Sequence, residues 1–326
     1  MQAIVIPEFG GPEVLRLEKV RTPRPDPREL LVRVEVSGVN RADLLQRRGL
    51  YPPPPGESEV PGLEFAGVVE EVGGAVSRWR PGDHVMGIVG GGGYAEQVVV
   101  DERVAVPVPH GMEMAVAGAI PEVYMTAYDA VFRQAGLEEG ETLLIHAVGS
   151  GVGTAALQLA RRAGARTIGT SRTGAKLERA AEEGLGVGLR GGEGWEAGVM
   201  DASGGRGADV ILDLVGAPYL AGNQAAIAVG GRHVVVGVPG GSRAGIDLRR
   251  LMVRRARLYG TVLRTRNVEE KAALAAEFSD AVLPGFEDGS LRPVIDSVLP
   301  VMKAADAHQR MEENRNFGKI VLTWRS

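Results

Sequence analysis

Gly149, Gly151 and Gly153 lie between an apolar run at 143–148 and an alanine- and leucine-rich segment at 154–165. Glycines at a turn from strand to helix let the backbone approach a pyrophosphate closely, and the first free N–H groups of the helix bind anions. The glycines fall at i, i+2 and i+4 rather than in strict GxGxxG spacing, so a purely structural turn is the alternative. We predict a dinucleotide site formed by Gly149, Ser150, Gly151, Val152 and Gly153.

The end of the next predicted strand, TIGTSRTGAK at 167–176, discriminates between cofactors. An NAD site places a carboxylate there to accept hydrogen bonds from the ribose hydroxyls. This segment has no carboxylate and offers Ser171, Arg172 and Lys176, which are donors or positive charges suited to a 2′-phosphate. We therefore expect NADPH, with solvated loop residues as the alternative interpretation.

Composition excludes several other kinds of site. The chain has no cysteine, and no two of its five histidines have i, i+4 spacing, so we expect no metal site. With a formal net charge of -4, the chain has no excess of basic residues for binding the phosphates of a nucleic acid. No stretch reaches the roughly 20 apolar residues that span a bilayer, so we expect no membrane partner and a cytoplasmic location.

The elements around these residues fall into three parts. Residues 1–109 read as short strands between glycine and proline clusters, whereas 143–263 alternate strand and helix, which predicts a doubly wound parallel sheet. The apolar segment at 257–263 is expected to be an edge strand of that sheet. The strands of the tail need a sheet to join, so we expect the tail to return to the β-rich part. The predicted domains are 1–121 with 265–326, and 122–264.

Four blocks, at 40–56, 61–73, 146–165 and 314–322, make the chain resemble the medium-chain dehydrogenase/reductase superfamily. The resemblance extends over nearly the whole chain and is closest to the zinc-free NADPH:quinone oxidoreductases, within them to the tumour-suppressor-inducible subgroup. It implies an α/β protein with a β-rich GroES-like catalytic domain and a Rossmann domain, and a homodimer paired through the edge strand. Asn40 and Leu63 stand where the zinc enzymes of the superfamily carry a ligand cysteine and histidine, so the resemblance implies no zinc.

The resemblance also implies roles for single residues. Asn40 and Tyr51 are expected to line the interdomain cleft near the nicotinamide, although the Tyr51 ring could simply pack beside the prolines at 52–55. Relatives often stack an aromatic residue on the adenosine at the end of the third strand, where this chain has Arg190 and Gly191; Arg190 could substitute by its charge. Further cofactor contacts are expected from Thr126, Gly216, Val238, Leu263 and Lys319, the last at the phosphates.

The predicted reaction is hydride transfer from NADPH to a quinone or a related α,β-unsaturated carbonyl. Positioning of the two reactants can carry much of this rate, and the Asn40 amide and the Tyr51 hydroxyl could stabilise charge on the substrate oxygen. One alternative is a 2-enoyl thioester reductase, which would need a basic entrance for coenzyme A. Another is a non-catalytic NADPH-binding protein with a structural or RNA-binding role.

Overall fold

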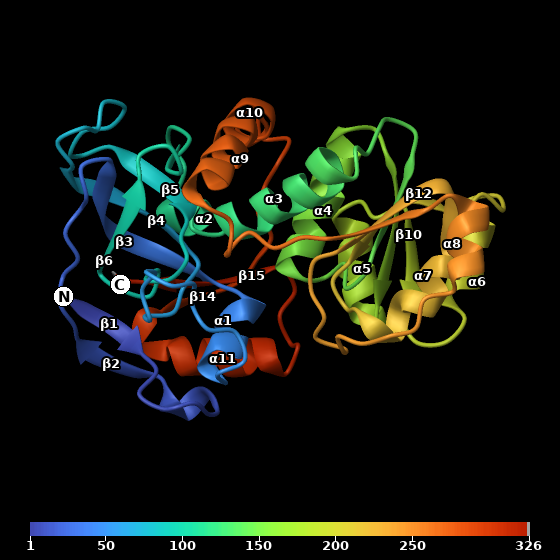
Figure 1. The fold of residues 1–326 in the computed structure, drawn as a ribbon, viewed down its shortest axis with the longest axis horizontal. Coiled ribbons are helices and arrows are strands. Elements are labelled where there is room, and N and C mark those ends of the chain that lie inside the picture. The colour runs from blue at the N-terminus through green and yellow to red at the C-terminus, as the bar shows by residue number, and fades with distance from the viewer. Residues whose placement is uncertain (325–326) are drawn as a thin grey trace. The chain divides into compact units, whose positions relative to one another are not determined.

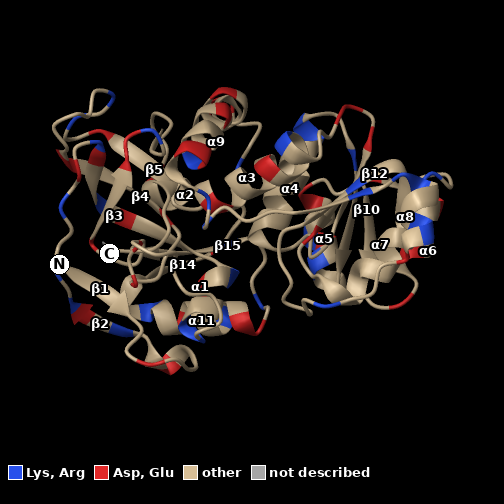
Figure 2. Ribbon diagram, in the orientation of Figure 1, with Lys and Arg blue, Asp and Glu red and all other residues tan. Residues whose placement is uncertain are grey.

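The computed structural model describes residues 1–324. The chain divides into two compact units, one formed by Met1–Met125 with Leu263–Ser326 and the other by Thr126–Val262 (Figure 1). Within the described residues, no helix combines the length and the apolar character needed to cross a membrane. Acidic and basic residues are spread over elements of both units, with a run of basic residues on α8 (Leu248–Arg254) (Figure 2).

A seven-stranded sheet is the core of the first unit, in the order β14-β15-β3-β4-β5-β7, with β6 also paired to β3. The tail contributes β15, which runs antiparallel to β3, and β14, which lies parallel to β15. The long strand β3 is buried along most of its length because it pairs with three other strands. The strands are β3 (Glu29–Val39), β4 (Glu64–Val72), β5 (His84–Ile88), β6 (Gln97–Asp101), β7 (Val106–Pro107), β14 (Ile295–Pro300) and β15 (Lys319–Thr323).

Shorter elements complete the first unit. A hairpin of β1 (Gln2–Val5) and β2 (Arg16–Lys19) forms a separate two-stranded sheet. The helices are α1 (Arg41–Arg47), α2 (Met114–Ala117), α9 (Val268–Ala281), α10 (Leu283–Glu287) and α11 (Ala304–Glu312), with 3₁₀ turns η1 (Pro12–Val14) and η4 (Val301–Lys303). One apolar cluster joins Leu44 of α1, Ala307 and Met311 of α11, and Ile320 of β15. This cluster fixes α1 and α11 against the strand supplied by the tail.

The second unit confirms the predicted doubly wound fold. Its six strands are all parallel, in the order β10-β9-β8-β11-β12-β13, and β13 is an edge strand as predicted. The central strand β8 has the sequence TLLI and all four of its residues are buried, as expected of a parallel strand covered on both faces. The strands are β8 (Thr142–Ile145), β9 (Arg166–Ser171), β10 (Val187–Arg190), β11 (Ala208–Asp213), β12 (Ile227–Val235) and β13 (Arg257–Gly260).

Helices cover this sheet, with α4 on β8 and β9, α5 on β9 and β10, and α8 on β12. They are α4 (Gly151–Arg162), α5 (Gly174–Glu182), α6 (Trp195–Ala202), α7 (Leu220–Ala226) and α8, with the 3₁₀ turn η3 (Ala217–Tyr219). The helix α3 (Pro121–Tyr128) continues into one π-helical segment, Asp129–Gln134, and carries the chain from the first unit into the second.

Candidate active site and cofactor site

Asn40, Glu64 and Lys319 form a buried cluster in the first unit. Asn40 precedes α1, Glu64 begins β4 and Lys319 begins β15, and at most 8% of each residue is exposed. The Asn40 amide donates to Glu64 Oε1 over 2.7 Å and its oxygen accepts from Lys319 Nζ over 2.8 Å. Lys319 Nζ also lies 2.5 Å from Glu64 Oε1. Gly38 makes room for this cluster, because a side chain there would overlap the Glu64 carboxylate.

These contacts bear on the expectations for Lys319 and Asn40, whose predicted roles stay predictions. Lys319 donates to the Val39 carbonyl as well as to Asn40 and Glu64, so each of its three ammonium protons has an acceptor within the first unit. The Asn40 amide already donates to Glu64, with a second, longer contact of 3.4 Å to the Gly38 carbonyl. Asn40 therefore belongs to a buried hydrogen-bond network, and its predicted contact with a substrate oxygen stays a prediction.

Glu122 adds a second carboxyl group beside this cluster. Its backbone N–H donates to Glu64 Oε2 over 2.8 Å, at the first turn of α3. Burial and the negative charge of Glu64 raise the pKa of Glu122 to about 8. No local pattern singles out Glu122, because nothing in PEVYMTAY shows that a glutamate 58 residues away will lie against it.

Tyr51 is held by an arginine that the sequence analysis did not single out. Arg264 lies 5.0 Å from the Tyr51 ring centroid and donates to the Tyr51 carbonyl over 2.9 Å. Its other donors reach the Gly90 carbonyl and Gln46 Oε1, so the guanidinium links the helix α1 to two loops of the first unit. Burial raises the pKa of the Tyr51 hydroxyl, which keeps it protonated and able to donate at neutral pH.

A second buried network in the first unit was also missed. Tyr94 Oη donates to Asp43 Oδ2 over 3.0 Å and lies 3.2 Å from His308 Nε2, while His308 Nδ1 lies 3.3 Å from Arg47 Nη1. Burial raises the pKa of Asp43 to about 6, and burial together with the charge of Arg47 lowers the pKa of His308 to about 3. The only sequence signal was the pairing of Asn40 with Asp43 three residues on, which is typical of a helix start.

In the second unit, the glycine-rich turn begins α4 as predicted. Ser150 caps the helix, because its side chain accepts from the Gly153 N–H over 3.1 Å. Gly153 is required by packing, since a Cβ atom there would lie 2.6 Å from the carbonyl oxygens of Ala147 and Val148. The turn also bends at Ala147, with φ of 50°, a position that the glycine pattern did not indicate. The pyrophosphate contacts predicted for this turn stay a prediction.

Ser171 and Arg190 end β9 and β10 and are register partners in the parallel sheet. Ser171 is buried, whereas Arg172 and Arg190 are exposed, so two guanidinium groups flank the end of β9. Lys176 follows in the first turn of α5 and is half-buried. The structure thus brings together the positive side chains that the sequence analysis grouped.

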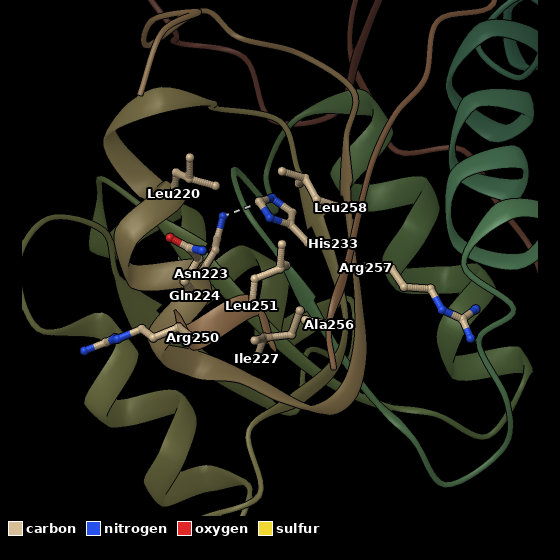
Figure 3. Close-up of a pocket in the computed structure, with 10 residues that line it drawn as sticks. All are labelled: Leu220, Asn223, Gln224, Ile227, His233, Arg250, Leu251, Ala256, Arg257 and Leu258. Carbon is tan, nitrogen blue, oxygen red and sulfur yellow. Dashed lines mark hydrogen bonds between the residues drawn. The ribbon is translucent and has the colours of Figure 1, made fainter. Parts of the chain in front are cut away.

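The remaining predicted cofactor residues divide between the two units. Gly216 and Val238 meet at the carboxyl ends of β11 and β12, where a Cβ atom at Gly216 would lie 2.9 Å from Val238 Cα. Val238 also lines a hollow with Gly237 and Thr261. Thr126 is buried in the second unit and Leu263 in the first. A further pocket, between α7, α8 and the strands β12 and β13, contains none of the predicted residues (Figure 3).

Comparisons with known proteins show which families have this architecture. The family model described as alcohol dehydrogenase GroES-like domain matches residues 26–110, and the zinc-binding dehydrogenase model matches 193–322. The quinone oxidoreductase of Rattus norvegicus is 33% identical over 99% of this chain and 97% of its own. A mycobacterial protein complexed with NADPH is 30% identical with a TM-score of 0.88, covering 99% of this chain and 100% of its own. An NAD-dependent alcohol dehydrogenase is 33% identical with a TM-score of 0.88, covering 99% of both chains.

The residues present do not fit the zinc that one family description implies. Zinc in proteins takes three or four thiolate, imidazole or carboxylate ligands. Leu63 is buried and its side chain has no atom that can bind a metal, and the Lys319 ammonium already neutralises Glu64. Over residues 1–324 no three His, Cys, Asp or Glu side chains gather in a way that could hold a metal ion.

With relatives matched over its full length, the chain belongs to the quinone oxidoreductase family of the medium-chain dehydrogenase/reductase superfamily.

Proposed function

We propose that this protein transfers a hydride from NADPH to a quinone or a related α,β-unsaturated carbonyl without a metal ion. The observation that carries the cofactor assignment is the pair of exposed guanidinium groups, Arg172 and Arg190, at the adjoining ends of β9 and β10. No carboxylate occurs in the turn at 171–176, where an enzyme that uses NADH needs one for the ribose hydroxyls.

The quinone substrate is supported by the names of the relatives, and the chemistry is compatible with the residues present. NADPH supplies the hydride, and the protein must hold the acceptor carbon at reacting distance. The Tyr51 hydroxyl is the donor best suited to the negative charge that develops on the substrate oxygen. Its ring is fixed by Arg264, and burial raises the pKa of its hydroxyl so that the proton stays on the oxygen at neutral pH.

Charge reversal at the end of β9 tests the cofactor assignment. Arg172→Glu and Lys176→Glu should each weaken NADPH binding by about 1 to 3 kcal/mol because a charge-assisted contact is lost, and should leave NADH binding nearly unchanged. Arg206→Glu, at an exposed position before β11, is the matched control. Equal affinities for NADH and NADPH in the unmodified protein would contradict the proposal.

A substrate screen tests the reaction. Initial rates with NADPH should be highest for ortho- or para-quinones or for simple enones. If an enoyl-CoA is preferred by tenfold or more, the protein is a thioester reductase. NADPH binding without turnover of any of these acceptors would favour a non-catalytic role.

A further inference from the structure

Asp213 is the centre of a buried hydrogen-bond network in the second unit. It is the last residue of β11, and the other members are Asn223 of α7, His233 of β12, His146 directly after β8 and Thr170 of β9. At most 3% of each of these residues is exposed. Because β9, β8, β11 and β12 are neighbours in the sheet, the network crosses four strands in succession near their carboxyl ends. None of its members was expected from the sequence to act in cofactor binding.

One oxygen of the Asp213 carboxylate shapes the turn that follows β11. Asp213 Oδ1 accepts hydrogen bonds from the backbone N–H groups of Val215, over 2.9 Å, and Gly216, over 2.8 Å. Gly216 has φ of 92°, and a Cβ atom there would lie 2.7 Å from the Gly241 carbonyl oxygen, so only glycine suits this position. The carboxylate therefore holds the chain in a sharp turn at 214–217.

That turn is bonded in its turn to the next loop, at 236–241. Backbone hydrogen bonds of 2.9 Å run from the Gly240 N–H to the Val215 carbonyl and from the Ala217 N–H to the Gly241 carbonyl. The first residues of the second loop line a hollow of about 290 Å³ at the carboxyl ends of β12 and β13. Asp213 is thus linked, through one turn, to a wall of this hollow.

The other oxygen of the carboxylate holds Asp213 in place. Asn223 Nδ2 lies 3.1 Å and His233 Nε2 lies 3.0 Å from Asp213 Oδ2, and because both point at one oxygen their nitrogens are 3.2 Å apart (Figure 3). Burial acts to raise the pKa of Asp213, but hydrogen bonds from His233 and the backbone lower it overall, so the group is ionised. An ionised carboxylate only accepts, which fixes the Asn223 nitrogen toward it.

The orientation of Asn223 connects Asp213 to the strands on its other side. The Asn223 oxygen faces His146, whose Nε2 lies 2.6 Å away and donates to it. The other ring nitrogen, His146 Nδ1, lies 2.8 Å from Thr170 Oγ1. His146 leads into the glycine-rich turn and Thr170 precedes Ser171, so the network lies beneath each segment predicted to contact the cofactor.

We infer that Asp213 is a positioning residue for the cofactor: its carboxylate holds the turn at 214–217, and with it Gly216 and Val238, in the conformation that receives NADPH. In a doubly wound sheet, ligands bind outside the carboxyl ends of the strands, which is where this turn lies. Asp213 itself is buried and both of its oxygens accept from the protein, so it acts through the turn. This inference rests on the proposed cofactor site.

Asp213→Asn tests the role with almost no change of shape. An amide has only one acceptor oxygen, so either the N–H groups of the turn or the side-chain donors lose their partner. The dissociation constants for NADPH and NADH, measured by fluorescence titration of the cofactor, should both rise about tenfold. The two should rise equally, because β8 separates β11 from β9, whose end carries the residues predicted for the 2′-phosphate. Unchanged constants in a folded Asp213→Asn protein would overturn the inference, as would a loss confined to NADPH.

Exchanging the carboxylate and the amide tests whether the network itself carries the effect. In the double variant Asp213→Asn with Asn223→Asp, the oxygen at position 213 can accept from the turn while its nitrogen donates to the new carboxylate. That carboxylate can also accept from His233 and His146, whose Nε2 atoms lie 3.2 Å and 2.6 Å from the Asn223 side chain. The double variant should bind both cofactors within about threefold of the unmodified protein. Binding as weak as that of Asp213→Asn alone would contradict the inference.

Asp209→Asn is the matched control. Asp209 lies near the amino end of the same strand and accepts from the Thr142 N–H over 2.8 Å. The chemical change is the same at the opposite edge of the sheet, so neither dissociation constant should change by more than about twofold. A loss of binding equal to that of Asp213→Asn would show a general effect on the fold and overturn the inference.

A milder variant covers the case in which Asp213→Asn does not fold. His233→Leu removes one donor and leaves the carboxylate, and both dissociation constants should rise about threefold. Unchanged constants in this variant would likewise overturn the inference. Near-ultraviolet circular dichroism of Trp195, whose ring lies 4.8 Å from that of His146, reports whether each variant has kept its fold.

The inference and the cofactor assignment fail in different ways. If Arg172→Glu weakens NADPH binding and Asp213→Asn weakens neither cofactor, the assignment stands and the positioning role is wrong. If the unmodified protein does not prefer NADPH, the assignment is wrong, and the response of NADH binding to Asp213→Asn still decides the positioning role.

Discussion

The Lys319 ammonium nitrogen lies 2.5 Å from Glu64 Oε1, with 3% of the lysine side chain and none of the glutamate side chain exposed. A strand of the tail thereby delivers a positive charge to the buried start of β4. Asn40 completes the cluster through its amide. Removing one partner of such a pair leaves an uncompensated buried charge, whereas removing both does not.

Lys319→Met should therefore lower the free energy of unfolding by about 3 to 5 kcal/mol, measured in urea. The double variant Glu64→Gln with Lys319→Met should recover a substantial part of that loss. Lys303→Met is the control, since Lys303 and Asp306 form an ion pair with 61% of each side chain exposed, and its loss should cost less than about 1 kcal/mol. A fully stable Lys319→Met protein would show that the cluster is not ionised.

The variant Tyr51→Phe tests whether the Tyr51 hydroxyl takes part in catalysis or whether the Tyr51 ring only lines the substrate pocket. If the hydroxyl bonds the substrate oxygen mainly in the transition state, turnover should fall roughly 10- to 1000-fold with NADPH affinity nearly intact. If the ring only lines the pocket, the change should appear in KM and turnover should barely move. Asn40→Ala is a useful companion, because its engaged amide predicts a loss of stability rather than a selective loss of turnover.

Glu122 should make stability depend on pH. Its pKa is about 8 in the folded protein, against 4.5 ordinarily, because of burial and the charge of Glu64. The folded state thus binds more protons than the unfolded state between these values, and the free energy of unfolding falls as pH rises from about 4.5 to about 8. Glu122→Gln should be more stable than the unmodified protein by about 1 to 2 kcal/mol at pH 8.5, a figure reduced for partial exposure.

The comparison at pH 5 is the control for Glu122→Gln. There the unmodified carboxyl is protonated when folded, so the advantage of glutamine should shrink. A stability difference that is the same at both pH values would show that Glu122 is ionised throughout. Urea unfolding at each pH measures both quantities.

His146 and His308 should stay neutral well below neutral pH. Burial lowers the pKa of His146 to about 4, and burial with the charge of Arg47 lowers that of His308 to about 3. Their ring C–H resonances, assigned by single substitution, should not move between pH 7 and pH 5. A titration midpoint near the ordinary value for either ring would show that this ring is solvated in the folded protein.

The edge strand β13 is the place where we expect two copies of the chain to associate. Leu258 of this strand is 39% exposed and Val262 just beyond it is 45% exposed, although the strand ends a parallel sheet. We propose that two copies pair across this edge to form a homodimer, because an open edge with apolar side chains favours strand pairing. Light scattering at micromolar concentration should give about twice the chain mass, and Leu258→Lys should shift it toward the monomer. A monomeric unmodified protein would refute the assembly.

The sequence by itself determined the features that depend on neighbours along the chain. Strand and helix periods predict the parallel sheet, since each period reflects burial of one face of a short segment. The turn at 149–153 is identifiable because strand, glycines and helix follow one another directly. The end of β9 is likewise readable, because the absence of a carboxylate at 171–176 is a local property.

Tertiary structure alone decided which distant side chains meet. Lys319 and Glu64 are 255 residues apart, and their contact requires β15 to pair with β3, which no local pattern specifies. His146 and Asn223 are 77 residues apart and meet because β8 and β11 are neighbours in the sheet. Long-range pairing changes the chemistry of a residue by supplying its hydrogen-bond partners and removing its water. That is why Lys319 could not be recognised from the sequence as a buried ion-pair partner.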